Sequence, residues 1–455
     1  MIKYIAHKVG KSTNYTCLVT DSDGNILSKT EVIIPLFIVT KKNFIYFILF
    51  DDHGKVIHPS YRYLNKRIIQ TSPNSRKQSA NAIRLLYCWL ALTNYDIYAL
   101  NQEQIDEMIS FFRGLSFEFD DSFSNQTIRS NNTVNVYLAT CRNYMQFLGI
   151  ENSPLYNMRI SNMVLSSAEY GVTSAVERVH YTNNLPTPNS RQIRTVPKYI
   201  SPDDFHKLFS LAAANNDKTA IILMHLMYGY GLRLGECLGL TLEDIQEVHR
   251  NNNLVPILII RNRMSDNPKF QSAKGKMHVQ DQREYKTSDY QHSKDEIIIT
   301  YDFYEQLCNY INETHEEAYE NYPENYSKGI ADIVSLRNRP DTNHYVFLNQ
   351  YGKVLSDATW NNHLKSYFLK AGLHIDYDTR NNNLSHRFRH GFAMFHTHYS
   401  EHQLDALQLQ KLMRHTNITS TMIYYNPTPE DEYQIKTEAQ QYLYDQIPEL
   451  KDLPF

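Results

Sequence analysis

The chain has 455 residues, 42% of them hydrophobic and 21% charged, and its formal net charge at pH 7 is −3. This length predicts about two or three domains, and the composition is typical of folded globular proteins. No apolar run reaches the roughly 18 to 20 residues that a membrane-spanning helix needs, and the first residues lack the apolar core of a signal peptide. We therefore expect a folded protein of the cytoplasm.

The five cysteines stand far apart and form no CxxC pair. They predict neither a disulfide framework nor a thiolate metal site. The charges are clustered, since Lys55–Arg84 holds seven basic residues and no acidic one, and Glu430–Phe455 holds seven acidic residues against two lysines. Because local patches determine whether a surface binds phosphate, the small negative net charge does not exclude a nucleic-acid partner.

Residues 1–60 carry the pattern of β-strands. β-branched and aromatic residues run from Val32 to Leu49, and turn residues stand at 21–25 and 51–54. We expect a β-rich N-terminal extension that packs on the following domain. A separate DNA-contacting arm is the alternative.

Residues 61–177 are expected to form a small helical domain. Ser72 and Pro73 predict a helix start, and apolar residues recur at helical spacing in 80–92, 102–114 and 133–148. The basic residues near the start of this domain suit contacts with phosphate groups, although a basic run is more often only a solvated face.

Residues 178–200 have the composition of a linker, because Arg178–Lys198 contains three prolines, four basic residues and no acid. A basic linker suits a protein that wraps DNA between two domains. A further domain, residues 201–429, begins with a helix cap at Ser201, and an acidic tail, residues 430–455, follows it. The candidate DNA-binding residues are Lys66, Arg67, Arg76, Lys77, Arg84, Arg191, Arg194 and Lys198.

Charged residues with apolar neighbours mark the 201–429 domain. Arg233 and Glu236 are three residues apart and share a helix face beside leucines, which would partly bury their charges. His386 and Arg389 share a second helix face. A zinc site on His386 and His390 is disfavoured, because arginines stand between them and no glutamate is adjacent.

Three segments together resemble the tyrosine recombinases, the phage integrase family. They are GLRLGECLGLTLEDI, HRFRH, and an RH pair followed by TMIYY, in the family's order and at compatible spacing. The resemblance covers residues 72–430, with the specific motifs in 231–245 and 384–425. It implies that the helical domain is a core-binding domain, that the 201–429 domain is catalytic, and that Arg414 stands where the family usually has glycine. By the resemblance, the active-site residues are Arg233, Glu236, His386, Arg389, His415 and Tyr424.

The family also uses a lysine on a β-hairpin between the first and second motifs. Here the strands expected at 256–261 and 296–300 flank a long polar insert. Lys274, Lys276, Lys286 and Lys294 are the candidates, and we favour Lys286.

The resemblance implies a chemistry that these residue types can perform. A tyrosine can hold the phosphate of a broken strand as a covalent ester. Two arginines bind its non-bridging oxygens, a lysine protonates the leaving 5′-oxygen, the histidines assist, and Glu236 orients these groups. The sequence shows neither a glycine-rich phosphate loop nor an acidic cluster for two metal ions, so we expect no cofactor and no metal.

The implied function is that of a site-specific tyrosine recombinase, an integrase or transposase that integrates or excises a mobile element through a covalent 3′-phosphotyrosine. A type IB-like DNA topoisomerase and a catalytically inactive DNA-binding relative are the alternatives. The expected fold is mainly α with small β elements (α+β). The expected partners are double-stranded DNA with specific recombination sites, further copies of the chain in a tetramer, and an excisionase or DNA-bending accessory protein, with no membrane. Bound to DNA, the protein would lie with the nucleoid.

Two features near the C-terminus concern this reaction directly. Tyr424 and Tyr425 differ by about 100° around a helix, so only one can point at the phosphate. In the family the nucleophile follows the second histidine by nine residues, which favours Tyr424. Residues 434–447 carry a partial apolar stripe, expected to pack on a neighbouring protomer or on the chain's own domain.

Overall fold

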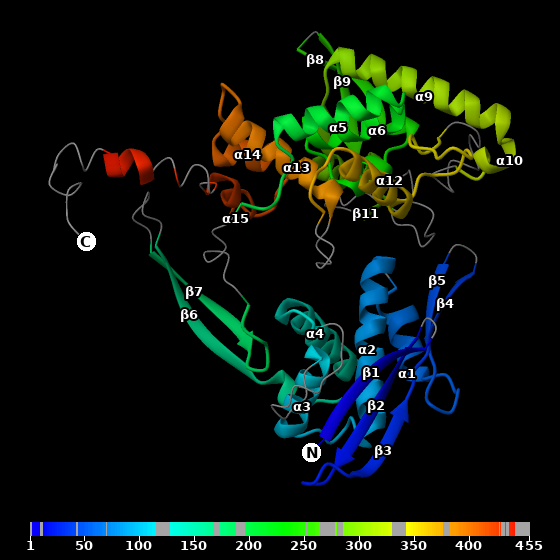
Figure 1. Cartoon of the computed structure of the whole chain (residues 1–455), viewed down its shortest axis with the longest axis vertical. Coiled ribbons are helices and arrows are strands. Elements are labelled where there is room, and N and C mark those ends of the chain that lie inside the picture. The colour runs from blue at the N-terminus through cyan, green and yellow to red at the C-terminus, as the bar shows by residue number, and fades with distance from the viewer. Residues whose placement is uncertain are drawn as a thin grey trace. The chain divides into compact units, whose positions relative to one another are not determined.

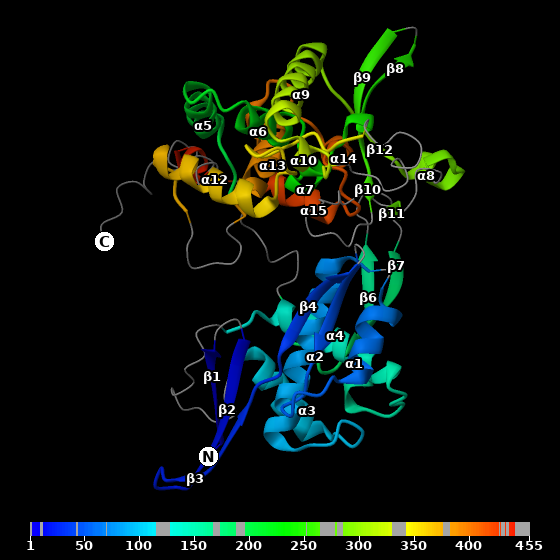
Figure 2. The same cartoon turned by 90° about the vertical axis from the view of Figure 1, so that its right-hand side faces the viewer.

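The computed structural model describes residues 2–9, 12–41, 44–69, 71–114, 128–166, 173–187, 196–251, 253–263, 278–279, 285–329, 343–375, 383–426, 428, 433 and 436–441. The chain divides into two compact units, Met1–Pro188 and Asn189–Phe455, and Figures 1 and 2 draw their elements. Helices with small sheets make up both units, so the expected α+β fold is confirmed. None of the described helices is long and apolar enough to cross a membrane.

The first unit begins with two small antiparallel sheets. A turn closed by Asp21, whose carboxylate accepts from the backbone N–H groups of Asp23 and Asn25 at 2.9 and 2.8 Å, joins the second strand to the third. The first sheet has the order β1-β2-β3 and the second is a hairpin of β4 and β5. Their bounds are Ile2–Val9 (β1), Ser12–Thr20 (β2), Ile26–Val32 (β3), Leu36–Lys41 (β4) and Phe44–Leu49 (β5).

Three long helices follow, and each begins at a side-chain cap. The Ser72, Asn101 and Ser130 side chains accept from backbone N–H groups of the first turns, which are otherwise unpaired. The elements are α1 (His58–Arg62), η1 (Tyr63–Arg67), α2 (Pro73–Thr93), α3 (Gln102–Arg113), α4 (Asn131–Phe147), η2 (Pro154–Tyr156) and the β6–β7 hairpin (Met158–Ser166 and Thr173–Tyr181).

The strands and helices of this unit share one hydrophobic core. The ring centres of Tyr4 and Tyr15 from the first sheet lie 5.3 and 5.2 Å from that of Phe111 in α3, and the fully buried Trp89 belongs to the same core. The N-terminal extension therefore packs on the helical domain, as expected.

Two expectations for this unit are wrong. Residues 178–181 do not belong to a linker, because they pair with β6 as the end of β7. Arg76 does not bind DNA from the surface: it is 1% exposed, donates from Nη1 to the Ile45 carbonyl at 2.9 Å and lies 5.4 Å from the Phe47 ring centre. It faces inward because helix α2 covers the strand that carries Ile45 and Phe47.

The second unit begins at the predicted cap, where the Ser201 hydroxyl accepts from the N–H of Asp204 at 3.1 Å. A three-stranded antiparallel sheet, in the order β12-β9-β8, lies beside a set of helices. In chain order, the elements up to and including the last strand of this sheet are α5 (Pro202–Ala214), α6 (Lys218–Gly229), α7 (Leu234–Leu238), η3 (Leu242–Asp244), β8 (Ile245–Arg250), β9 (Asn253–Ile260), β10 (Asn262–Arg263), β11 (His278–Val279), α8 (Ser288–Ser293) and β12 (Asp295–Ile298).

Helices make up the rest of this unit. They are α9 (Tyr301–Asn321), α10 (Pro323–Tyr326), α12 (Asp357–Lys370), α13 (Leu384–Met394), η5 (Phe395–Tyr399), α14 (Ala406–Leu412), α15 (Thr419–Met422) and η6 (Ile423–Tyr425). Within the tail, residues 436–441 are helical. The expected stripe at 434–447 lies mostly outside the described residues.

Helix α13 packs against α6. Gly391 permits this approach, because a Cβ atom there would lie 2.6 Å from both the Ile200 carbonyl and the Tyr228 ring. Phe388 on the same helix is fully buried with Trp360 in the main core. Helix α13 is therefore fixed in place, and with it the two motif residues that it carries.

Candidate active site

The turn between α6 and α7 forms one wall of the site. Gly231 has φ +62°, which glycine adopts readily, and a Cβ atom there would lie 2.7 Å from the Phe392 ring. Arg233 is the N-cap of α7 and Glu236 is its third residue. The backbone N–H of Arg233 donates to Glu236 Oε2 at 2.8 Å, and its Nη1 donates to Oε1 at 2.6 Å. The predicted pair therefore forms, with the carboxylate buried and the guanidinium partly exposed.

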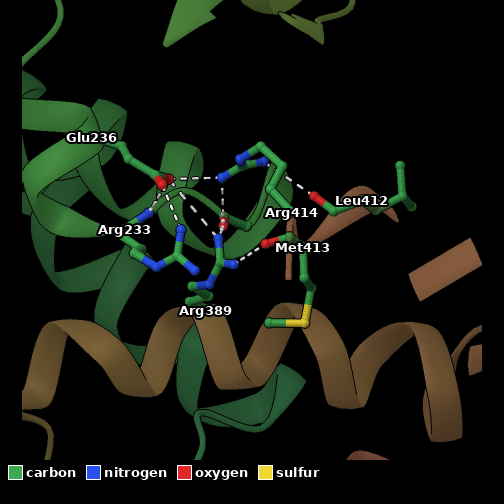
Figure 3. Close-up of polar contacts among 7 residues, drawn as sticks. Arg233, Glu236, Arg389, Leu412, Met413 and Arg414 are labelled. Carbon is green, nitrogen blue, oxygen red and sulfur yellow. Dashed lines mark hydrogen bonds and ion pairs between the residues drawn. The ribbon is translucent and has the colours of Figure 1, made fainter. Parts of the chain in front are cut away.

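Arg389 reaches this wall from the middle of α13 (Figure 3). Its side chain is 1% exposed, and it donates to the carbonyl oxygens of Gly231 and Met413. Its Nη1 lies 3.9 Å from Glu236 Oε2. Burial, together with the nearby Arg233, lowers the pKa of Arg389 to about 9, so the side chain remains a cation at neutral pH.

Arg414 is a third arginine on the same carboxylate, and sequence reasoning did not assign it to the site. Its Nη2 donates to Glu236 Oε2 at 2.7 Å and to the Gly231 carbonyl at 3.3 Å (Figure 3). Burial opposes ionisation of Glu236, but the charges of Arg414, Arg389 and Arg233 outweigh it and lower the pKa of its carboxyl group. Glu236 is therefore a buried anion held by several cations, as buried charges require.

The backbone at Arg414 explains why the family usually has glycine there. Arg414 follows the C-cap of α14 and has φ +52°, a left-handed conformation that costs a non-glycine residue about 1 to 2 kcal/mol. Its N–H donates to the Lys411 carbonyl and that of His415 donates to the Gln410 carbonyl, the pattern of a Schellman motif. The geometry that positions His415 is thus kept despite the substitution.

Tyr424 lies in a small cluster with Phe392 and Met413, and is 3% exposed. Its hydroxyl oxygen lies 2.7 Å from His390 Nδ1. His398 Nε2 donates to its backbone carbonyl at 2.9 Å and fixes the chain there. Burial raises the pKa of the Tyr424 phenol to about 12, while Arg389 and Arg233 act in the opposite direction.

The histidines surround this tyrosine. The His415 ring is stacked at 6.4 Å from the Tyr424 ring, and its Nδ1 lies 3.0 Å from the Thr421 hydroxyl. The His386 ring meets the His390 ring edge to face at 4.5 Å. Burial lowers the pKa of His390 to about 3 and that of His415 to about 4, with His386 and the arginines adding to the effect. Both imidazoles are therefore neutral at pH 7.

Sequence reasoning considered His390 only as a zinc ligand and did not assign it to the tyrosine site. It lies one helical turn after His386, a spacing that places both on one face, so the periodicity alone could have shown it. Arg414 gave only the weaker signal of standing next to His415.

Tyr425 points elsewhere. Its hydroxyl donates to the Leu404 carbonyl at 2.7 Å, and burial raises its pKa. The adjacent tyrosines therefore face different surroundings.

The favoured lysine, Lys286, lies in the chain between β11 and α8. Lys286 is exposed, and among the described residues no hydrogen bond or ion pair joins it to Arg233, Arg389 or Tyr424. Its neighbour Tyr285 donates from its hydroxyl to Glu243 Oε1 at 3.1 Å, and the guanidinium carbon of Arg261 lies 4.1 Å from the centre of the Tyr285 ring.

Of the other lysine candidates, Lys294 forms an ion pair with Glu296 at 2.7 Å, and Lys274 and Lys276 lie outside the described residues.

The candidate DNA-binding residues differ in their exposure. Lys66, Arg67, Lys77 and Lys198 are exposed, and Arg84 is partly buried. Arg191 and Arg194 lie outside the described residues. Arg76 is the buried exception noted above.

Several arginine side chains and a tyrosine hydroxyl come together in this site, and their chemistry indicates what kind of ligand it can bind. Arg233, Arg389 and Arg414 leave a net positive charge around Glu236, which suits an anion with several oxygens. The charges of Arg389 and Arg233 oppose the rise in the pKa of the Tyr424 phenol, so these cations act on the tyrosine hydroxyl. Such an arrangement can bind a phosphate group beside a tyrosine hydroxyl.

The phage integrase family matches residues 198–431, just over half of the chain, and the chain belongs to this family. It is 25% identical over 301 residues to tyrosine recombinase XerA of Pyrococcus horikoshii, covering 64% of this chain and 78% of that protein. It is also 26% identical over 223 residues to transposase A from transposon Tn554 of Staphylococcus aureus, covering 48% of this chain and 59% of the transposase. The resemblance to tyrosine recombinases is thereby confirmed, and with it the assignment to the DNA-cleaving and rejoining enzymes.

Proposed function

We propose that this chain is a site-specific recombinase of a mobile element, which cleaves and rejoins DNA with Tyr424 as its nucleophile. The observation that carries the proposal is the meeting of the Tyr424 hydroxyl, His390 and the arginines around Glu236 in one buried site. The relatives named as recombinases and as a transposase support the choice of reaction.

In the proposed reaction, Arg233 and Arg389 bind the non-bridging oxygens of the scissile phosphate. Charge develops on these oxygens as phosphorus becomes pentacoordinate, and one preorganised donor in a comparable site is worth about 3 to 4 kcal/mol. Arg389 is already held by two backbone carbonyls, so it needs little rearrangement. Glu236 orients Arg233 through its two contacts to that residue.

The Tyr424 oxygen then attacks phosphorus, and the bond from phosphorus to the 5′-oxygen breaks. The phenol proton leaves through His390, and the 5′-oxygen takes a proton from a general acid, for which we propose Lys286 with help from His386 and His415. The product is a 3′-phosphotyrosine and a free 5′-hydroxyl. Because the phosphotyrosine ester conserves the energy of the broken phosphodiester bond, a 5′-hydroxyl from another strand can attack it and rejoin the DNA without ATP.

The partner is proposed to be double-stranded DNA. Lys66, Arg67 and Lys77 in the first unit and Lys198 in the second are exposed and suit phosphate contacts. Pairing of two sites would require further copies of the chain in a tetramer, held through the 430–455 tail, and an excisionase or bending protein could set the direction.

One experiment tests the reaction without a known target sequence. A pool of nicked duplexes with a random central segment is incubated with the protein in EDTA, and DNA that stays attached after denaturation is recovered and sequenced. We expect an adduct enriched for one sequence motif. Strict dependence of cleavage on Mg²⁺ would exclude the mechanism.

The same pool separates the alternatives. Adducts without sequence preference, with relaxation of supercoiled plasmid, would indicate a type IB-like topoisomerase. Sequence-specific binding without any adduct would indicate an inactive DNA-binding relative.

A further inference from the structure

The guanidinium group of Arg414 donates its hydrogen bonds to groups inside the protein. Nη2 contacts Glu236 Oε2 at 2.7 Å and the Gly231 carbonyl at 3.3 Å, and Nη1 contacts the Leu412 carbonyl at 3.1 Å. The side chain is 8% exposed, and Nε is buried without a hydrogen-bond partner among the described residues. Arg414 therefore contacts the same groups that hold Arg233 and Arg389, the Glu236 carboxylate and the Gly231 carbonyl.

The contacts of Glu236 show what Arg414 changes. Oε1 accepts from Arg233 Nη1, and Oε2 accepts from the Arg233 N–H and from Arg414. Arg389 Nη1 lies 3.9 Å from Oε2, and the Nη1 and Nη2 atoms of Arg389 donate to two backbone carbonyl oxygens instead. A single carboxylate can offset only one positive charge. With Arg414 bound to Oε2, less of that negative charge is set against Arg389.

Arg414 also ties two segments together. The Gly231 carbonyl receives both Arg389 and Arg414, and the Leu412 and Met413 carbonyls receive one each. The turn before α7 and the end of α14 are thus joined through two guanidinium groups (Figure 3). Since His415 follows Arg414 directly, this connection fixes the histidine relative to Arg233.

We propose that Arg414 is a positioning residue of the strand-cleavage reaction: it pairs with Glu236 and joins the Gly231 turn to the end of α14, so that Arg233 and Arg389 keep their charge for the scissile phosphate. The proposal rests on the recombinase function proposed above. It explains why an arginine occupies a left-handed backbone position that favours glycine.

The test compares Arg414→Gly, Arg414→Lys and Arg414→Gln on a nicked duplex recovered from the random pool with the wild-type protein. Glycine suits the backbone at φ +52°, so this substitution removes the side chain without adding strain. Asn216→Gly is the matched control, because Asn216 lies in the same unit at φ +51° and is exposed. Single-turnover adduct formation, duplex affinity and thermal unfolding are measured for each protein.

We expect Arg414→Gly to form the adduct about 10-fold or more slowly per folded molecule, with duplex affinity close to wild type. Its unfolding temperature should be lower, because the substitution removes one partner of the buried ion pair with Glu236. Arg414→Lys should recover part of the rate because it keeps the charge, whereas Arg414→Gln should not. Asn216→Gly should cleave normally.

Three results would overturn the inference. They are a wild-type rate in Arg414→Gly, an equal rate in the lysine and glutamine variants, or a loss of rate that only parallels a loss of folding. Absence of any adduct with the wild-type protein would instead refute the recombinase function on which the inference rests.

Discussion

The Nδ1 atom of His390 lies 2.7 Å from the hydroxyl oxygen of Tyr424. His390 comes from the helix that also carries Arg389, so one element positions both the cation that we propose binds the phosphate and the hydrogen-bond partner of the proposed nucleophile. Because the pKa of His390 is lowered to about 3, its ring is neutral at pH 7 and can accept the phenol's hydrogen bond. The hydroxyl is thereby held in a fixed direction before DNA binds.

His390→Phe should slow adduct formation by roughly 100-fold, because it keeps the ring's volume but removes the acceptor for the Tyr424 proton. Duplex affinity should stay near wild type, since the ring is largely covered. Single-turnover cleavage of a nicked duplex measures the rate, and filter binding measures affinity.

His396→Phe is the control for this prediction. His396 is a half-buried histidine of the following turn whose ring packs on Phe392 and Phe395 rather than on Tyr424. It should cleave at close to the wild-type rate. Equal rates in the two phenylalanine variants would show that the His390 contact has no part in the reaction.

The same histidines predict a loss of stability in acid. Burial holds the pKa values of His390 and His415 at about 3 and about 4, below the ordinary 6.5. Between these values the unfolded chain binds protons that the folded chain does not, so the free energy of unfolding should fall as the pH drops from about 6.5 towards about 4. Urea unfolding at several pH values measures this, and His390→Phe should flatten the dependence. An unchanged slope in the variant would show that His390 titrates normally.

The parts of the fold that local signals specify were predictable. The Ser201 cap and the apolar spacing of α2, α3 and α4 predicted helices that the structure contains, because caps and periodicity act over a few residues. Strand β1 lies within the region 1–60 that was predicted to form strands, but it could not be singled out, since lysines and a histidine interrupt the apolar residues of Ile2–Val9. The end of β7 was taken for linker because its composition is basic, and only pairing with β6 reveals a strand.

The site was predictable where the family's motifs cover it and not beyond. Arg233, Glu236, Arg389 and Tyr424 meet as the motif order implies. The contact between Arg414 and Glu236 joins residues 178 positions apart and depends on a left-handed backbone, which spacing along the sequence does not reveal. Burial likewise separated Arg76 from its neighbour Lys77, although both count equally in a basic run.

Substitution of Lys77 should affect DNA binding, whereas substitution of Arg76 should affect stability. Lys77→Ala removes an exposed charge, so it should weaken duplex binding for every sequence and reduce the slope of log K against log salt by about 0.9 if it neutralises one phosphate. Arg76→Ala should leave that slope unchanged but lower the free energy of unfolding by about 2 to 3 kcal/mol, because it removes a buried charged hydrogen bond. Salt titrations and urea unfolding of both variants check this pair. An Arg76→Ala protein that is fully stable, or an unchanged salt slope in Lys77→Ala, would contradict the respective assignment.

The last prediction concerns which of two adjacent tyrosines attacks the phosphate. The Tyr424 hydroxyl lies in hydrogen-bond contact with His390, and the charges of Arg389 and Arg233 act to lower its pKa. The Tyr425 hydroxyl instead donates to the Leu404 carbonyl. Tyr424→Phe removes one oxygen and little packing, so this variant should bind the duplex normally and form no adduct. Tyr425→Phe loses a hydrogen bond worth about 1 kcal/mol and should still cleave. Mass spectrometry of the peptide that retains a nucleotide identifies the attacked residue directly, and a label on Tyr425, or an adduct that survives in Tyr424→Phe, would show that the nucleophile is misassigned.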